Sequence, residues 1–394
     1  MHKKVRSIGV ILLITMSLTT GCWDRVDIND RALLLGWGMD ITDDEKYQAT
    51  DQFAIPQKLV PGQSGGSKGN AFCIATGVGD NIQEAGLNMQ TKLSRPWFAG
   101  QRRILLIGDG LAKYGIGEVI DEYSRNPAVR LRTDLMIVKG GTANAFFKQS
   151  YPLERLPAFA SVNIHQAIGV KPDVTLRDFL MAASSNGDTP VLPAFKMISD
   201  ASSDRLKQGD ENDPIPNIRS FGLAIFDRDL KFKGYLNFKN SITRRWIRGE
   251  LKTNKVTAFI PGAKGNAAIE MSSLKSKINP VLQGNHMNIH VTLTGKGAIS
   301  ENNTNLDLSQ PHNVKVLEAA LDKQAEQQAL QVIHVSCKRN TGLTPLDSAY
   351  SFIVNTQIYQ YFADSDISVK ANLTIQSVGL TGPSLLSKED DVKQ

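Results

Sequence analysis

The sequence predicts an α/β or α+β protein that is long enough for two or three domains. One observation is a strand, a helix and a second strand within residues 103–138, which together make a βαβ unit. Another is a hairpin pattern over 221–236, where two apolar runs flank a polar turn. The third is an alternating strand at 286–294 that precedes a helix from about Val314 and a closing strand at 367–375.

The first residues have the layout of a secretory leader. Lys3, Lys4 and Arg6 form a basic segment, and an apolar run of 11 residues follows at 8–18. That run is too short to cross a bilayer, which takes about 20 residues. It ends in Thr19-Thr20-Gly21-Cys22, which predicts cleavage after Gly21 and lipid attachment to the thiol of Cys22 on the outer face of the bacterial cytoplasmic membrane. The alternative is an ordinary leader whose cysteine is incidental.

Charge and cysteine content exclude several classes of protein. Removal of the leader takes away three basic residues and lowers the formal net charge from +6 to +3, which is no signature of nucleic-acid binding. Cys73 and Cys337 lie far apart in sequence and show no metal-binding spacing. We expect two buried free thiols, with a long-range disulfide as the alternative.

The N-terminal elements follow from apolar runs and helix signals. Residues 61–69 are rich in glycine and serine and predict a flexible loop. Asp80 and Asn81 are candidate N-caps, and Asn126-Pro127 ends a later helix. We predict strands at 32–35, 48–55, 71–76, 103–107 and 133–138, and helices at 82–93, at 116–123 and from Thr175.

The remaining elements follow a charged stretch at 200–217, which is typical of a linker. Beyond the hairpin, Asn240 is a candidate cap for a short helix with several arginines, which we interpret as a solvated face or as a contact for lipid headgroups. Thr344-Pro345 predicts another helix start.

Three patterns resemble catalytic or cofactor motifs but lack the required context. Gly65 to Gly69 matches G-x-S-x-G, yet no strand precedes it and no helix follows. His286 and His290 share a strand face without an evident third metal ligand. Gly77-Val78-Gly79 lacks the third glycine of a dinucleotide site. We therefore expect no enzyme, no cofactor and no metal.

A resemblance to a known family begins at the predicted anchor and continues along the chain. The matching segments are 21–30, 36–40, 104–112, 135–140, 188–193, 221–226 with 234–237, and 367–380. In these the chain resembles Ger(x)C-type spore germination lipoproteins, the C subunits of nutrient germinant receptors. It departs from the family at 238–241, where an acidic residue is usual, and at Tyr359 and Tyr361, where tryptophan is expected.

The resemblance implies an α+β fold of α/β type, in which three domains are built of mixed or antiparallel sheets packed against helices. It also implies a non-catalytic subunit that acts with membrane-spanning A and B subunits and is held to lipid through acylated Cys22. A solute-binding lipoprotein of a transporter is an alternative, and it would need two doubly wound lobes. A lipid-anchored hydrolase is a third possibility, for which the sequence offers no coherent set of catalytic residues.

The segment after the anchor is predicted to be a tether. Trp23 suits the headgroup zone of a membrane, whereas Asp24, Arg25 and Asp30 cannot enter hydrocarbon. These three residues, together with Trp23 and Ile28, are candidate partner contacts, and a mobile spacer is the alternative. The full division is a signal peptide at 1–21, the tether at 22–30, an N-terminal α/β domain at 31–200, a linker at 201–217, a small β-rich middle domain at 218–270, a C-terminal α/β domain at 271–385 and a tail at 386–394.

Overall fold

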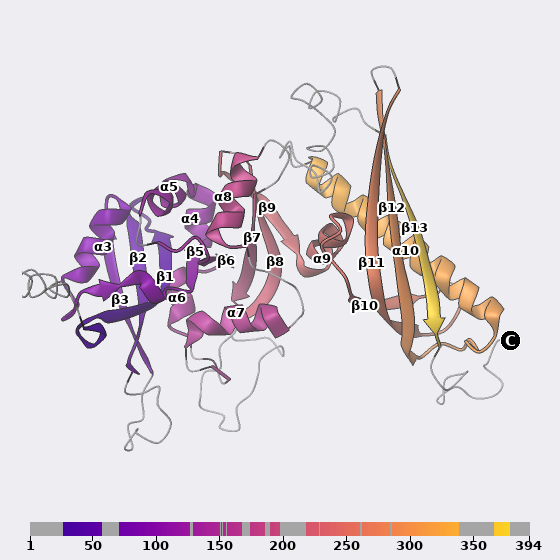
Figure 1. Cartoon of the computed structure of the whole chain (residues 1–394), viewed down its shortest axis with the longest axis horizontal. Coiled ribbons are helices and arrows are strands. Elements are labelled where there is room, and N and C mark those ends of the chain that lie inside the picture. The colour runs from indigo at the N-terminus through magenta and orange to yellow at the C-terminus, as the bar shows by residue number, and fades with distance from the viewer. Residues whose placement is uncertain are drawn as a thin grey trace, which may run out of the picture.

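The computed structural model arranges the chain around two β-sheets that lie side by side along its long axis (Figure 1). It describes residues 27–56, 71–126, 129–149, 151, 153–154, 156–167, 174–185, 190–197, 218–227, 229–260, 262–283, 286–338 and 366–378. The α+β class predicted from the sequence is confirmed, because sheets of mixed and antiparallel strands pack against helices.

The larger sheet has the strand order β3-β2-β1-β5-β6-β7-β8-β9, with β4 paired to the start of β1. Its central strands β1, β5, β6 and β7 are parallel, and the flanking pairs are antiparallel. The elements are η1 (Ile28–Asp30), β1 (Ala32–Ile41), β2 (Tyr47–Ala54), β3 (Phe72–Gly79), α3 (Ile82–Gln90), β4 (Trp97–Phe98), η2 (Ala99–Gln101), β5 (Ile104–Gly108), α4 (Asp109–Tyr114), α5 (Gly117–Arg125), β6 (Asp134–Lys139), α6 (Ala143–Phe147), α7 (Pro157–Ala167), α8 (Leu176–Ser184), β7 (Val191–Met197), β8 (Ile218–Phe226) and β9 (Phe232–Asn237).

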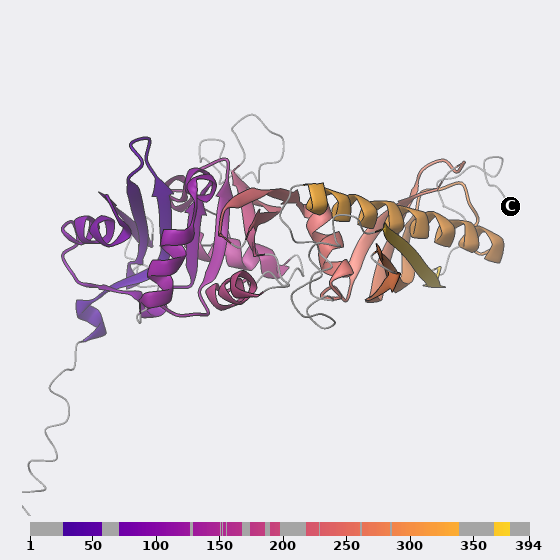
Figure 2. The same cartoon turned by 90° about the horizontal axis from the view of Figure 1, so that it is seen from above.

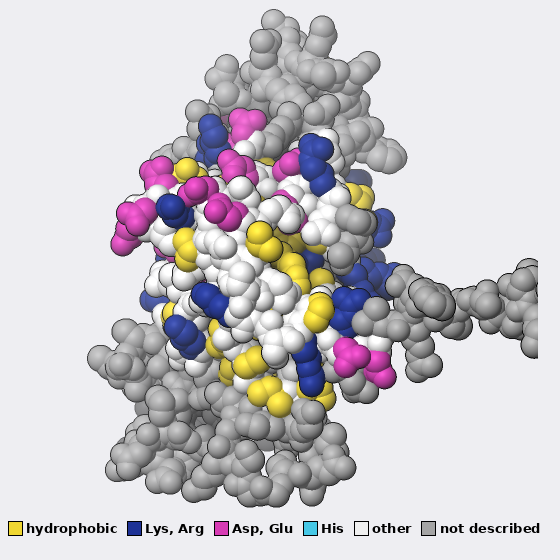
Figure 3. Space-filling model, turned by 90° about the vertical axis from the view of Figure 1, so that its left-hand side faces the viewer, with side chains coloured by type: hydrophobic (Ala, Val, Ile, Leu, Met, Phe, Trp, Pro, Cys, Tyr) yellow, Lys and Arg dark blue, Asp and Glu magenta, His cyan; other side chains and the backbone are white. Residues whose placement is uncertain are grey.

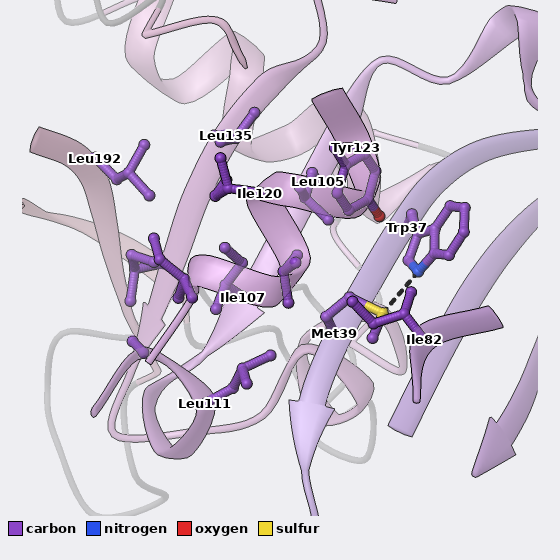
Figure 4. Packing of buried hydrophobic residues seen from close by; sticks show 14 of the residues in the cluster. Trp37, Met39, Ile82, Leu105, Ile107, Leu111, Ile120, Tyr123, Leu135 and Leu192 are labelled. Atoms are coloured by element: carbon purple, nitrogen blue, oxygen red, sulfur yellow. Dashed lines mark hydrogen bonds between the residues drawn. The ribbon is translucent and has the colours of Figure 1, made fainter. Parts of the chain in front are cut away.

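Helices cover both faces of this sheet, and each face has its own core. Side chains of α3, α4, α5 and α8 pack with Trp37, Leu105 and Ile107 on one face (Figure 4). Side chains of α6 and α7 pack with Leu106 and Phe195 on the other. The unit β5–α4–α5–β6 is the βαβ unit that the apolar runs predicted, since β5 and β6 are parallel neighbours.

The smaller sheet has the order β10-β11-β12-β13 and carries one long helix on one face (Figure 2). Its elements are α9 (Phe238–Ile247), β10 (Asn254–Phe259), β11 (Asn266–Gln283), β12 (His286–Asn302), α10 (Pro311–Lys338) and β13 (Asp366–Ser377). Carboxylates of α10 accept backbone N–H groups of the edge strand β13, in the pairs Glu318–Ile375, Asp322–Leu373 and Glu326–Ala371. These bonds occupy backbone N–H groups of β13 that would otherwise be open to pairing with a further strand at this edge of the sheet.

The segment 218–270, predicted as a small middle domain, is divided between the two sheets. The hairpin β8–β9 forms as expected, but β8 pairs with β7 and extends the larger sheet. β10 and the start of β11 belong to the smaller sheet. The reason is that β7 offers β8 an open edge over seven paired positions, and a two-stranded hairpin alone is only marginally stable.

The helix α9 joins the two sheets. At its start, Ser241 donates a hydrogen bond to the carbonyl of Asn237 at the end of β9, over 2.8 Å. At its end, the indole of Trp246 donates to the carbonyl of Lys275 in β11 over 3.2 Å. Asn237 caps the helix, rather than the predicted Asn240, because its side chain accepts the N–H of Asn240.

Two further expectations need correction. Cys73 was expected to be buried, but its side chain is exposed and its thiol is free. The side chain of Cys337 lies outside the described residues. β11 was not predicted, because its sequence mixes Ser, Lys and Pro with few consecutive apolar residues. No described helix has both the length and the apolar character needed to cross a membrane.

Candidate functional site: the tether root and the aromatic cluster behind it

The predicted tether enters the described structure at its last residues. Cys22, Trp23, Asp24 and Arg25 lie outside the described residues. The side chain of Ile28 is 53% exposed although it is apolar, and Asp30 is also exposed. A tight turn forms here because the N–H of Asp30 donates to the carbonyl of Asp27 over 3.1 Å. The partner contacts assigned to this segment remain predictions.

The last residues of the tether, 27–30, are called the tether root here; they run directly into β1, whose first residues pair with β4. The N–H of Ala32 donates to the carbonyl of Pro96 over 2.9 Å, and Ala32 and Leu33 pair in parallel with Trp97 and Phe98. Both aromatic residues are half-buried. The pairing therefore places these two aromatic residues beside the point where the tether enters the domain.

Behind β4 lies a cluster of aromatic rings packed edge to face. The ring of Trp37 lies 5.1 Å from that of Trp97 and 5.4 Å from that of Tyr123, with interplanar angles of 65° and 67°. The indole N–H of Trp37 points at the sulfur of Met39, as Figure 4 shows. Such edge-to-face pairs contribute about 0.5–1.5 kcal/mol each beyond the area that they bury.

A buried arginine completes this cluster. The guanidinium carbon of Arg102 lies 4.8 Å from the ring centroid of Trp37 and 5.0 Å from that of Tyr123, and the residue is only 2% exposed. Asp51 is fully buried on the neighbouring strand β2, directly across from Trp37 in the strand register. Burial raises the pKa of the Asp51 carboxyl well above its usual value, and the charge of Arg102 opposes that rise.

Among the described residues, neither charged group makes a direct hydrogen bond. The carboxylate oxygens of Asp51 and the guanidinium nitrogens of Arg102 have no partner within bonding distance there. The Arg102 cation therefore lies against the faces of two aromatic rings, and its charge acts on the Asp51 carboxyl through space by lowering the pKa of that group. This buried charge pair is what the sequence reasoning missed. No spacing signals it, because its members come from separate elements.

The opposite face of β1 explains the run Gly36-Trp37-Gly38-Met39-Asp40. A Cβ atom at Gly38 would lie 2.6 Å from the Cβ of Ala143, so glycine is needed for α6 to approach the strand. The Asp40 carboxylate accepts the N–H groups of Ala143 and Asn144 over 2.8 and 3.0 Å. Burial raises the pKa of Asp40 to about 6, although these two bonds lower it.

A surface hollow opens above the aromatic cluster, between α3 and α5. It encloses ≈ 220 Å³ and is lined by Trp37, Ile82, Gln83, Gly86, Leu87, Gln90, Trp97, Glu122 and Asn126. It adjoins a wider groove along α5 where Glu118, Asp121 and Glu122 lie. Figure 3 views the molecule from this end and shows hydrophobic side chains from the centre to the bottom of the view, with most of the acidic ones at the upper left.

The motif-like patterns have structural roles where the structure describes them. His286 contacts Asp366 over 3.1 Å and His290 contacts Ser368 over 2.7 Å. The described residues contain no group of three or more His, Cys, Asp or Glu side chains that could hold a metal ion. A Cβ atom at Gly77 would collide with α3, so this glycine serves packing. The Gly65–Gly69 pattern lies outside the described residues.

Comparison with known proteins now decides the family. Residues 24–197 match the model of the spore germination protein N-terminal domain. Residues 221–379 match the model of the C-terminal domain of spore germination proteins like B3 and GerAC. The chain belongs to this spore germination protein family. The resemblance noted in the sequence is therefore confirmed.

Individual relatives match along most of their length. The chain is 23% identical to spore germination protein KC of Bacillus subtilis (strain 168) over 390 residues, which is 95% of this chain and 96% of that protein. It is 24% identical to spore germination protein B3 of the same strain, over 84% of each. It is 23% identical to GerQC of Bacillus cereus, over 94% of this chain and 99% of that one.

A solved structure shares the fold of this spore germination chain. The crystal structure of the GerBC protein aligns with a TM-score of 0.54 at 18% sequence identity, and the alignment covers 86% of this chain and 97% of that one. At this identity the likeness concerns the fold alone. The structural likeness agrees with the α+β class, in which both sheets of this chain pack against helices.

Proposed function

We propose that this chain is the lipid-anchored C subunit of a nutrient germinant receptor, with no catalytic activity of its own. In this role it acts beside membrane-spanning A and B subunits at the outer face of the spore's inner membrane. The single observation that carries the proposal is the match of two germination-protein domains, in order, over almost the entire chain after the Gly21-Cys22 leader boundary.

The anchor gives the proposed subunit a physical role. One acyl chain holds a protein only marginally, so the two or three chains of a bacterial lipoprotein are needed for stable residence. Confinement at the membrane surface then raises the effective concentration of the chain around integral partners. The exposed turn at Ile28–Asp30 leads from that anchor into β1 and β4.

The alternative of a solute-binding lipoprotein finds little support in the strand order. Such proteins consist of two doubly wound lobes with helices between parallel strands. Here the smaller sheet is antiparallel except for the β12–β13 pair, and its described helix α10 lies on one face. Only the larger sheet has a parallel centre.

Affinity purification of the tagged chain from detergent-solubilised spore membranes tests the proposal. The expected result is co-purification of two multi-spanning proteins whose genes lie beside the gene for this chain. A matched control carries the same tag on an unrelated lipoprotein of the same spores, which should not retain them. Recovery of a transporter permease and its ATPase instead would favour the solute-binding alternative and contradict the receptor proposal.

A further inference from the structure

The smaller sheet has an outer face on the side opposite to α10. Along β12, Ile289, Val291 and Leu293 are buried in the core beneath α10. Thr292 and Thr294 alternate with them and therefore point away from that helix. The same alternation in β11 and β13 places every second residue on this outer face.

Four exposed lysines gather on the outer face in adjacent rows of the strand register. Lys277 of β11 and Lys370 of β13 flank Thr292 in one row. The remaining rows are Lys275–Thr294–Asn372 and Ser272–Lys296–Thr374. Neighbouring strands lie about 4.8 Å apart, so the Cα atoms of Lys277 and Lys370 are separated by roughly 10 Å.

None of these lysines forms an ion pair among the described residues, and the exposed Glu270 lies in the row next to Lys296. By contrast, Lys46, Lys113 and Lys233 elsewhere each contact an aspartate. The other side chains of the three rows are Ser, Thr and Asn, which can donate hydrogen bonds to an anion. A face of this composition is electrostatically suited to a surface that carries many negative charges.

The outer face and the tether root lie toward the same side of the molecule. In Figure 1 the strands β11, β12 and β13 pass in front of α10. Figure 2 shows η1, in indigo, on the side toward which these strands lie relative to α10. A plane that touches η1 can therefore also meet the outer face at the opposite end of the long axis.

We propose that this lysine face of Lys275, Lys277, Lys296 and Lys370 binds the anionic headgroups of the membrane that holds the tether. A bilayer surface can meet several rows of an exposed sheet face at once, and neither hollow described above has a lysine of this face in its lining. An acidic protein segment would gain more from a groove that also holds its backbone. The orientation argument rests on the proposed lipid anchor, but the test below does not.

The test measures how the mature chain, residues 22–394 without acylation, co-sediments with vesicles of phosphatidylcholine with and without phosphatidylglycerol. We expect binding only when phosphatidylglycerol is present, with a steep decrease as salt is added. Each lysine near an anionic surface changes partitioning about fivefold, so K277Q/K370Q should bind about 30-fold more weakly. Circular dichroism checks that the variant retains its fold.

The control is K315Q/K323Q, which removes the same charge from two exposed lysines of α10 on the other side of the sheet. It should bind vesicles as the unchanged chain does. An equal loss in both variants would reduce the effect to net charge and overturn the proposal. Unchanged vesicle binding by K277Q/K370Q would overturn it as well, and defective germination by that variant would then assign the face to an acidic protein partner.

Discussion

Replacing Arg102 with Met removes the positive charge from the aromatic cluster while leaving a side chain of similar length. The guanidinium is buried between the rings of Trp37 and Tyr123, and Asp51 lies buried nearby. The variant therefore leaves Asp51 as a buried carboxyl with no compensating charge. Breaking a buried pair in this way costs about 3–5 kcal/mol of unfolding free energy.

The unfolding free energy that Arg102→Met loses should depend on pH, and linkage fixes the direction of that dependence. Burial holds the folded-state pKa of Asp51 above its unfolded value, and loss of Arg102 raises it further. The folded chain then binds a proton that the unfolded chain releases between those two values. The deficit of the Arg102→Met variant is therefore smallest in acid, where Asp51 is protonated in both chains, and grows as pH rises through the folded-state pKa of Asp51.

Urea unfolding followed by tryptophan fluorescence at several pH values measures the unfolding free energy of each variant, because Trp37 and Trp97 lie in the affected cluster. The double variant Arg102→Met/Asp51→Leu removes both charges and should recover most of the lost stability. Arg103→Met is the matched control on an exposed neighbour and should cost less than about 1 kcal/mol. The reasoning is refuted if the Arg102 and Arg103 variants cost the same, or if the two changes in the double variant simply add.

The remaining predictions concern packing, chemistry and the tether. Gly38→Ala should lower the unfolding free energy by about 1–3 kcal/mol in the same assay, since its Cβ would meet α6, whereas Gly86→Ala in α3 has open space and should raise it by roughly 0.5–1 kcal/mol. Ser67→Ala should leave germination unchanged, and loss of germination at normal protein abundance would return us to a hydrolase. Charge reversal at Asp24 and Arg25 should impair receptor assembly while the melting temperature stays constant. Normal germination by that variant, still membrane-bound and at normal levels, would make the segment a spacer.

The elements that the sequence predicted well are those where one local signal dominates. β5 and β6 are continuous apolar runs, and both are buried on the two faces of the sheet. The hairpin β8–β9 has a polar turn between two apolar runs. β11 has no such signal, because its outward face carries lysines and its Pro280 is disfavoured in most strands.

The candidate site was predictable only in part. The anchor and tether are encoded by neighbouring residues, so a local pattern is enough to propose them. The pair of Arg102 and Asp51 depends on how β2 registers against β1 and on where η2 turns the chain. A single sequence does not contain that register. For the same reason the attachment of β8 to β7, which divides the predicted middle domain, could not be foreseen.

The most direct measurement of the central claim is the fate of Cys22 in sporulating cells. Sporulating cells that express the unchanged chain or Cys22→Ala are fed labelled fatty acid, and the membranes of the resulting spores are separated from soluble protein. The lipid-anchored receptor subunit predicts label and membrane residence for the unchanged chain. It predicts no label for Cys22→Ala, with the mature domains released or held only by an uncleaved leader. Label that persists on the Cys22→Ala chain would contradict the account.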